Sequence, residues 1–133
     1  MENKCIATTA APAAIGPYSQ GIAAGSFAFV SGQLPIDPQV GKFAGEDIKS
    51  QTRQSLTNVK EVLAANGMEL KDVVKTTVYL ADIGEFSAMN EVYAEFFKEP
   101  YPARAAFQVA ALPQQARVEI EVVARKGNNN DEI

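Results

Sequence analysis

Two strand-like segments near the end of the chain, 104–109 and 116–125, most constrain the fold. Side chains in the second segment alternate between apolar and charged residues, a period of two that predicts a strand with one buried face. The apolar positions are Val118, Ile120, Val122 and Ala124, and the charged positions are Arg117, Glu119, Glu121 and Arg125. Pro100 and Pro102 disfavour a helix before the first segment, and Leu112-Pro113 ends it. We therefore expect the two strands to form a hairpin.

Such a hairpin would hold Arg104 and Glu119 as candidates for one site. Arginine binds a planar carboxylate with two parallel hydrogen bonds, and a nearby glutamate can position or deprotonate a water molecule. The pair therefore predicts hydrolysis of a small substrate that carries a carboxylate. The alternative is an ordinary cross-strand ion pair, which contributes little to stability. The residue types alone do not decide between the two.

Composition excludes several classes of chemistry. The 133 residues are enough for one domain, and they include no histidine and one cysteine, Cys5. Ser-His-Asp and Cys-His catalysis, histidine or cysteine metal sites and an intrachain disulfide are therefore excluded. The net charge of −4 makes nucleic acid an unlikely partner. No apolar run approaches the roughly 20 residues that span a bilayer, and no signal-like segment is present, so we expect a cytoplasmic protein with no membrane association.

The rest of the pattern predicts an α+β fold in the order β-β-α-β-α-β-β, with two helices on one face of a single sheet. We expect a hairpin over 16–34, helices over 46–66 and 85–98, and a strand over 70–81 between them; a short strand is also indicated near Cys5. We expect one domain over 1–126 and a flexible polar tail over 127–133.

Two helices leave the other face of the sheet uncovered. This face is expected to carry a mixture of polar and apolar residues, namely Lys75, Thr77, Tyr79, Arg117, Glu119, Val123 and a phenylalanine of the first hairpin. The mixture is typical of a wet subunit interface, so we expect a symmetric homo-oligomer.

Three further motifs have both a functional and a structural interpretation. Tyr18 could place a phenol at a cleft edge or pack on an edge strand. Ser31-Gly32 could present a hydroxyl and an approachable backbone N–H to an anion, or form a β-bulge, which we favour. Asn90 lies beside the apolar face of the second helix, where it either finds a partner or faces solvent.

Five segments together resemble the RidA/YjgF family of enamine/imine deaminases, from about residue 6 to 125. They are AAPAAIGPYSQG, FVSGQLP, TTVYLAD, FSAMNEVYAEFF and YPARAAFQVAALPQQARVEIEVVA, and the pattern PAR…LP…VEIE is specific to the family. The resemblance implies a chorismate-mutase-like fold and a homotrimer with a central barrel and clefts between subunits. It also implies hydrolysis of 2-aminoacrylate, 2-iminopropanoate or 2-iminobutanoate to 2-keto acids and ammonia. No cofactor is implied, and the substrates would come from PLP-dependent dehydratases.

The resemblance also implies roles for particular residues. Arg104 would bind the substrate carboxylate, and Glu119 would position the attacking water. The cleft would be lined by Tyr18, Ser31, Gly32 and Asn90. Ala106 stands where the family often has cysteine; its backbone N–H could still bind the carboxylate, but any role of a thiol is lost.

Two alternatives to an enzyme stay open. One is a non-catalytic regulator that binds 2-keto acids. The other is a binding protein, because relatives have been described as translation inhibitors that act on RNA or as holdases. The acidic net charge argues against RNA binding.

Overall fold

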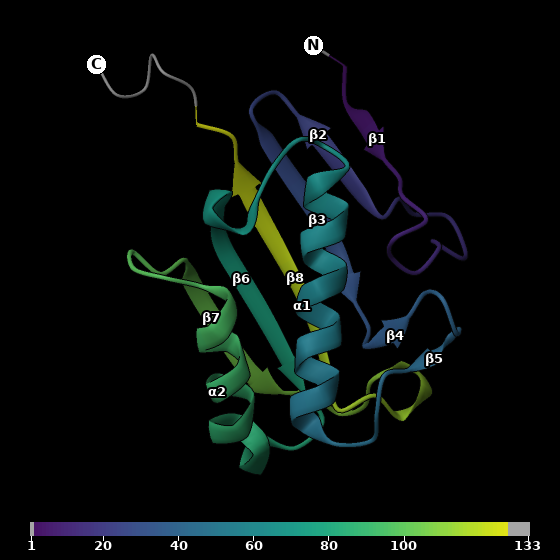
Figure 1. The fold of residues 1–133 in the computed structure, drawn as a ribbon, viewed down its shortest axis with the longest axis vertical. Helices are drawn as coiled ribbons and strands as arrows, with labels where there is room; N and C mark the ends of the chain where they lie inside the picture. Colours follow the sequence, from purple (N-terminus) through teal and green to yellow (C-terminus); the bar gives the residue numbers. More distant parts are fainter. Residues whose placement is uncertain (1, 128–133) are drawn as a thin grey trace.

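One mixed six-stranded sheet forms the body of the molecule in the computed structural model, which describes residues 2–127 (Figure 1). The strands lie in the order β1-β2-β3-β8-β6-β7, and all neighbours are antiparallel except β6 and β7. Their bounds are β1 Lys4–Ile6, β2 Gly21–Ala24, β3 Phe27–Gln33, β6 Val73–Leu80, β7 Ala103–Gln108 and β8 Val118–Arg125. The helices are α1 Ile48–Ala64 and α2 Phe86–Phe96.

The predicted α+β class and the order of the long elements are confirmed. The structure adds a separate two-stranded sheet, β4 (Ile36–Asp37) with β5 (Lys42–Phe43), so the prediction of a single sheet was incomplete. These two-residue strands lie between the predicted hairpin over 16–34 and the predicted first helix, where the sequence pattern predicts no strand. The α1 helix ends at Ala64, two residues before the predicted end at 66, and Gly67 just beyond it adopts a φ of +70° that residues with a side chain rarely adopt.

The predicted hairpin of 104–109 with 116–125 was wrong, because β6 lies between β7 and β8. Both β6 and β8 have eight residues, and they pair along their length from Val73↔Ala124 to Leu80↔Val118. Each has a face of fully buried residues, so both belong in the centre of the sheet. By contrast, β7 has no fully buried residue and takes the edge, in parallel to β6 through the α2 crossover.

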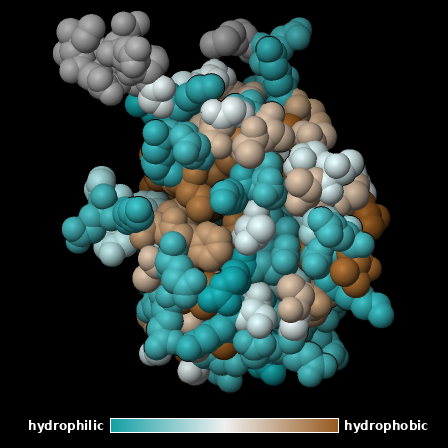
Figure 2. All heavy atoms as spheres, viewed as in Figure 1, coloured by the Kyte–Doolittle hydropathy of each residue, from teal (hydrophilic) through white to brown (hydrophobic). Residues whose placement is uncertain are grey.

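The hydrophobic core lies between the sheet and the two helices, which are on the same side of it (Figure 1). The fully buried side chains of α1, such as Leu56, Val59 and Leu63, pack in one cluster with Val118 and Ile120 of β8. The outer face formed by the helices carries mainly hydrophilic side chains (Figure 2). No helix within residues 2–127 combines the length and the apolar composition needed to cross a membrane.

The opposite face of the sheet is uncovered by any described element and exposes aromatic rings. Phe27, Phe29 and Phe107 are 40%, 48% and 45% exposed. The prediction that Arg117 lies on this face was wrong: its guanidinium pairs with Glu85 at 3.1 Å and donates to the carbonyl of Glu46, beyond the end of the strand. The trimer predicted to cover this face stays a prediction. The tail predicted over 127–133 lies, apart from Gly127, outside the described residues, and the domain boundary at 126 stays a prediction too.

Candidate active site

The Arg104 guanidinium lies over one face of α2. Residues Phe86, Asn90 and Tyr93 share this face because they are spaced by four and three positions in the helix. The guanidinium carbon lies 4.7 Å from the Tyr93 ring centroid and 5.3 Å from that of Phe86, and an Nη1–H donates to Asn90 Oδ1 at 2.7 Å. Cation–π contacts and one hydrogen bond therefore orient the side chain.

A pocket of about 380 Å³ opens beside this guanidinium. It is lined by Asn90, Tyr93, Ala94, Tyr101, Pro102 and Arg104. A guanidinium has five N–H donors in a planar fork, and Asn90 engages one of them. The others can bind a planar anion such as a carboxylate.

The backbone N–H of Ala106 faces the free edge of the sheet, on the side of β7 away from β6. The N–H of Val109 donates to Leu80 on β6 at 2.9 Å, and N–H groups alternate between the two sides of a strand. The N–H groups of Arg104 and Ala106 therefore point away from β6. Ala106 itself is half-buried against the core, so its side chain does not block this edge.

Glu119 lies against a bulge in β3. The pairing of β3 with β8 shifts between Val30 and Gln33, which confirms the predicted bulge at Ser31-Gly32. A methyl group built on Gly32 would come 2.0 Å from Glu119 Oε2 and 2.9 Å from its Cδ. Glycine at position 32 thus leaves the space that the carboxylate occupies.

Two effects raise the pKa of Glu119. The half-buried carboxyl loses solvation, and the negative charge of Glu121 on the same face adds repulsion. Tyr79 is the cross-strand neighbour of Glu119, and its hydroxyl donates to Glu121 Oε1 at 2.5 Å, which together with burial and the two carboxylates raises the pKa of Tyr79 to about 12. Tyr79 therefore stays a neutral hydrogen-bond donor.

Tyr18 lies on the loop between β1 and β2, and its ring is 54% exposed. The Ser31 hydroxyl donates to the carbonyl of Ser19 at 2.6 Å, which ties this loop to the bulge. The buried amide of Gln20 holds the other side of the loop: it accepts from the Thr8 N–H and donates to the carbonyls of Thr8, Ala11 and Pro12. Ser31 thus uses its proton within the chain, and it can offer a ligand only its oxygen.

The structure brings the predicted residues together in two groups, not one. The first group is Arg104, Asn90 and Ala106; the second is Glu119, Gly32, Ser31 and, on the adjoining loop, Tyr18. Arg104 pairs with Thr76 and Glu119 with Tyr79, three residues apart on β6. An odd separation places side chains on opposite faces, so the expectation that a hairpin brings Arg104 and Glu119 together within one chain was wrong.

Several residues around both groups were not predicted from the sequence. Tyr93 and Phe86 belong to the apolar stripe of α2, and their spacing to Asn90 could have indicated a shared face. Tyr79 and Glu121 were not considered for the site, although both lie on the face of Glu119.

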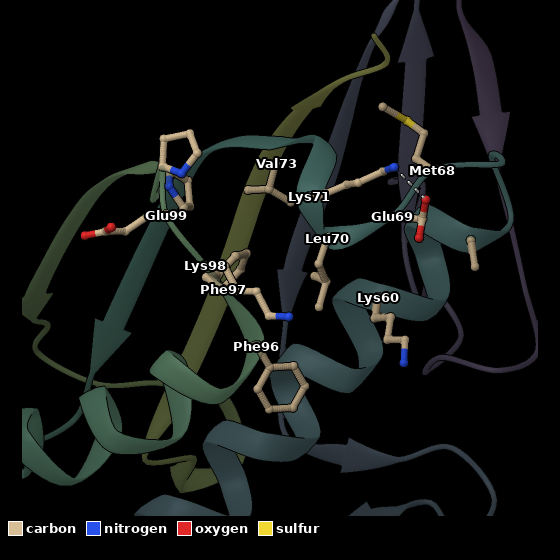
Figure 3. A pocket seen from close by; sticks show the side chains of 13 residues that line it. Lys60, Met68, Glu69, Leu70, Lys71, Val73, Phe96, Phe97, Lys98 and Glu99 are labelled. Carbon is tan, nitrogen blue, oxygen red and sulfur yellow. Dashed lines mark ion pairs between the residues drawn. The ribbon is translucent and has the colours of Figure 1, made fainter.

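A second pocket, of about 570 Å³, lies between the end of α1 and the segment that leads from α2 to β7 (Figure 3). Apolar side chains including Leu70, Phe96 and Phe97 line it, and Lys71 pairs with Glu69 on its rim at 3.4 Å. It shares only Pro102 with the Arg104 pocket and contains no predicted site residue. Among residues 2–127, no three His, Cys, Asp or Glu side chains are grouped so that they could hold a metal ion.

The fold and the two groups define a small α+β protein with an oriented guanidinium beside an open pocket. A family model described as Endoribonuclease L-PSP matches residues 8–126. A RutC family protein of Pyrococcus horikoshii is 54% identical over 121 residues, which are 91% of this chain and 96% of the relative. The human protein named 2-iminobutanoate/2-iminopropanoate deaminase is 47% identical over 124 residues, 93% of this chain and 90% of that protein.

Solved structures agree with these relatives. The crystal structure of Escherichia coli TdcF with bound serine matches with a TM-score of 0.89 at 45% identity, and the match covers 93% of this chain and 99% of that one. The chain therefore belongs to the Endoribonuclease L-PSP family and, as its sequence motifs predict, to the RidA/YjgF proteins within it.

The raised pKa of Glu119 predicts a pH-dependent effect of Glu119→Gln on stability. The folded state favours the protonated carboxyl. Ionisation of Glu119 therefore lowers the free energy of unfolding as the pH rises from 4.5, the ordinary pKa of a glutamate, through the raised pKa of the folded state. Glu119→Gln removes this cost. Its free energy of unfolding, relative to the wild type, is expected to increase over this range and then level off.

Urea unfolding at a series of pH values measures this difference. The matched control is Glu46→Gln, the same substitution in an exposed side chain, measured in the same series. A Glu119→Gln difference that is constant with pH, or that grows on acidification, would contradict the assignment.

Proposed function

We propose that the protein hydrolyses reactive enamines and imines of small carboxylic acids, such as 2-aminoacrylate, 2-iminopropanoate and 2-iminobutanoate, to 2-keto acids and ammonia. The observation that carries the proposal is an oriented guanidinium beside an open pocket, in a chain that also holds a half-buried carboxyl with a raised pKa. The names of relatives at 47 to 49% identity support the same reaction.

The mechanism needs orientation and one activated water molecule. Arg104, with the Ala106 N–H, binds the substrate carboxylate and fixes the adjacent imine carbon. Glu119 accepts a proton from water as the water oxygen bonds to that carbon, and the electron pair of the C=N bond moves to nitrogen. Glu119 passes this proton to nitrogen, and the hydroxyl proton then moves through Glu119 to nitrogen as well, so that the C–N bond breaks, ammonia leaves and the ketone forms. An enamine first takes a proton on carbon, which gives the iminium ion, and loss of an N–H proton gives the imine.

The raised pKa of Glu119 suits this role. A general base is most effective when its pKa approaches the working pH, and burial beside Glu121 moves the pKa of this carboxyl in that direction. The chain contains no histidine that could serve instead. No metal or organic cofactor takes part in the proposed reaction, because an iminium carbon is already electrophilic.

The two groups lie on opposite faces of one chain, so we propose that a complete site forms between two copies. Arg104, Asn90 and Ala106 of one subunit would face Glu119, Gly32, Ser31 and Tyr18 of the next. A homotrimer with a central barrel would provide three such clefts and would bury the exposed phenylalanines of the uncovered face. In this proposal the enzyme is cytoplasmic and acts after PLP-dependent dehydratases, whose released products match the substrate.

Two other functions are alternatives. A regulator that binds 2-keto acids would use the same Arg104 pocket without turnover. RNA binding, to which the family description refers, fits poorly with a net charge of −4, and a holdase would need no Arg104. Turnover that depends on Arg104 separates the enzyme from these alternatives.

Replacement of Arg104 tests the proposal directly. Wild type is expected to release ammonia and keto acid from freshly generated 2-aminoacrylate faster than the spontaneous rate. Arg104→Ala is expected to lower kcat/KM about 100-fold, because it removes the charge that binds the carboxylate. Arg104→Lys keeps the charge but not the planar set of N–H donors, so its kcat/KM should lie between those of wild type and Arg104→Ala.

Arg53→Ala is the matched control, since Arg53 pairs with Glu95 on the outer face of the helices. It is expected to keep the wild-type rate. Wild type that never exceeds the spontaneous rate, with this or longer imino acids, would refute the enzyme and leave a binding protein.

Gly32→Ala tests the role of the bulge. The added methyl group would displace the Glu119 carboxylate, with which it would overlap, and a shift of about 1 Å can cost up to about 100-fold in rate. We expect kcat to fall at least about tenfold, with a smaller change in KM, since the Arg104 pocket is untouched. Steady-state kinetics on the same substrate measure both constants.

The control is Gly127→Ala, where a methyl group meets no atom within 4 Å. Wild-type kcat in Gly32→Ala would show that Glu119 does not act from the position seen here.

A further inference from the structure

The partners of Arg104 are all uncharged. Within residues 2–127 no acidic side chain lies within ion-pair distance of Arg104, and its contacts are the rings of Phe86 and Tyr93 and the amide oxygen of Asn90. Arg53 and Arg117, by contrast, each pair with a glutamate. An acidic partner would neutralise the guanidinium, whereas rings and an amide orient it and leave its charge for a ligand.

Tyr93 is the most firmly held of these partners. It is 6% exposed, and its hydroxyl lies 2.8 Å from Thr76 Oγ1, a fully buried contact. Its ring also packs on Phe97 with centroids 4.6 Å apart. Burial raises the pKa of Tyr93, so the phenol stays neutral and keeps its hydrogen bond.

Thr76 is also the residue that pairs with Arg104 in the sheet. The backbone pairing, the Thr76–Tyr93 hydrogen bond and the contact of the Tyr93 ring with the guanidinium therefore close a ring of three residues. An arginine side chain has four rotatable bonds and loses much freedom when it is fixed. Because this arrangement restricts the side chain before a ligand binds, less conformational entropy is lost on binding, which favours it.

We infer that Tyr93, anchored by Thr76, is a positioning residue that aims Arg104 at the substrate carboxylate through an uncharged platform. The inference rests on the proposed function for the identity of the ligand. Tyr93 lies beneath the guanidinium, and its effect on the reaction passes through Arg104.

Substitutions at Tyr93 should therefore change KM more than kcat, because the carboxylate is bound in the ground state and in the transition state alike. Tyr93→Leu removes the ring and is expected to raise KM for 2-iminobutanoate about tenfold, with kcat within about twofold of wild type. Tyr93→Phe keeps the ring but loses the anchor and should raise KM about threefold. Asn90→Asp keeps the hydrogen bond but adds a negative charge that pairs with Arg104, so it should also raise KM.

Val92→Ala is the control for a general loss of helix packing. Val92 is 1% exposed in the same helix and does not line the Arg104 pocket, so this variant should lose stability and keep the wild-type KM. An unchanged KM in Tyr93→Leu, or an equal rise in Val92→Ala, would refute the inference.

A second readout does not depend on turnover. The NMR signal of the Arg104 Nε–Hε group, without ligand, is expected to report an ordered side chain in wild type and Val92→Ala and a mobile one in Tyr93→Leu. If wild type shows no deaminase activity, the proposed function fails but this comparison still decides the role of Tyr93. An equally ordered Arg104 in Tyr93→Leu would overturn it.

Discussion

The position of β6 between β7 and β8 is the constraint on which the rest of the structure depends. It pairs in parallel with β7 and antiparallel with β8, and these two registers fix where Arg104 and Glu119 lie. Their partners on β6 are separated by an odd number of residues, so the two side chains leave the sheet on opposite faces. One chain therefore presents the Arg104 guanidinium and its pocket on one side of the sheet and the Glu119 carboxyl on the other.

In each group, the neighbouring residues determine how the charged side chain is held. On the helix side, rings and an amide hold a guanidinium without neutralising it. On the open side, a bulge and a glycine make room for Glu119, while burial and Glu121 raise its pKa. An ion pair within the chain would satisfy both residues and remove the reactivity of each. The sheet keeps them apart, so within one chain neither side chain neutralises the other.

Sequence patterns predicted the long elements of the fold but not how the strands pair. Periodicity was sufficient for β8, β6, α1 and α2, because each carries a clear apolar stripe. Pairing partners were not predictable in the same way: β7 and β8 follow each other closely in sequence, which favours a hairpin, but the matched buried faces of β6 and β8 determine the sheet. The positions of Tyr93 and Glu121 around the site depend on that pairing, so no local motif identified them. Arg104 and Glu119 could be predicted as site residues from their chemistry and from the family resemblance, because neither depends on how the strands pair.

The central claim is that Arg104 and Glu119 act together from different copies of the chain. The most direct measurement mixes inactive Arg104→Ala and Glu119→Gln subunits, by co-expression with two tags, and compares the deaminase rate of the mixed oligomers with that of each variant alone. In a symmetric ring with sites between copies, random mixing regenerates about one quarter of the sites with both side chains intact. We therefore expect the mixed oligomers to recover about a quarter of wild-type activity. Mixed oligomers no more active than the separate variants would show that the two residues do not complement each other across an interface.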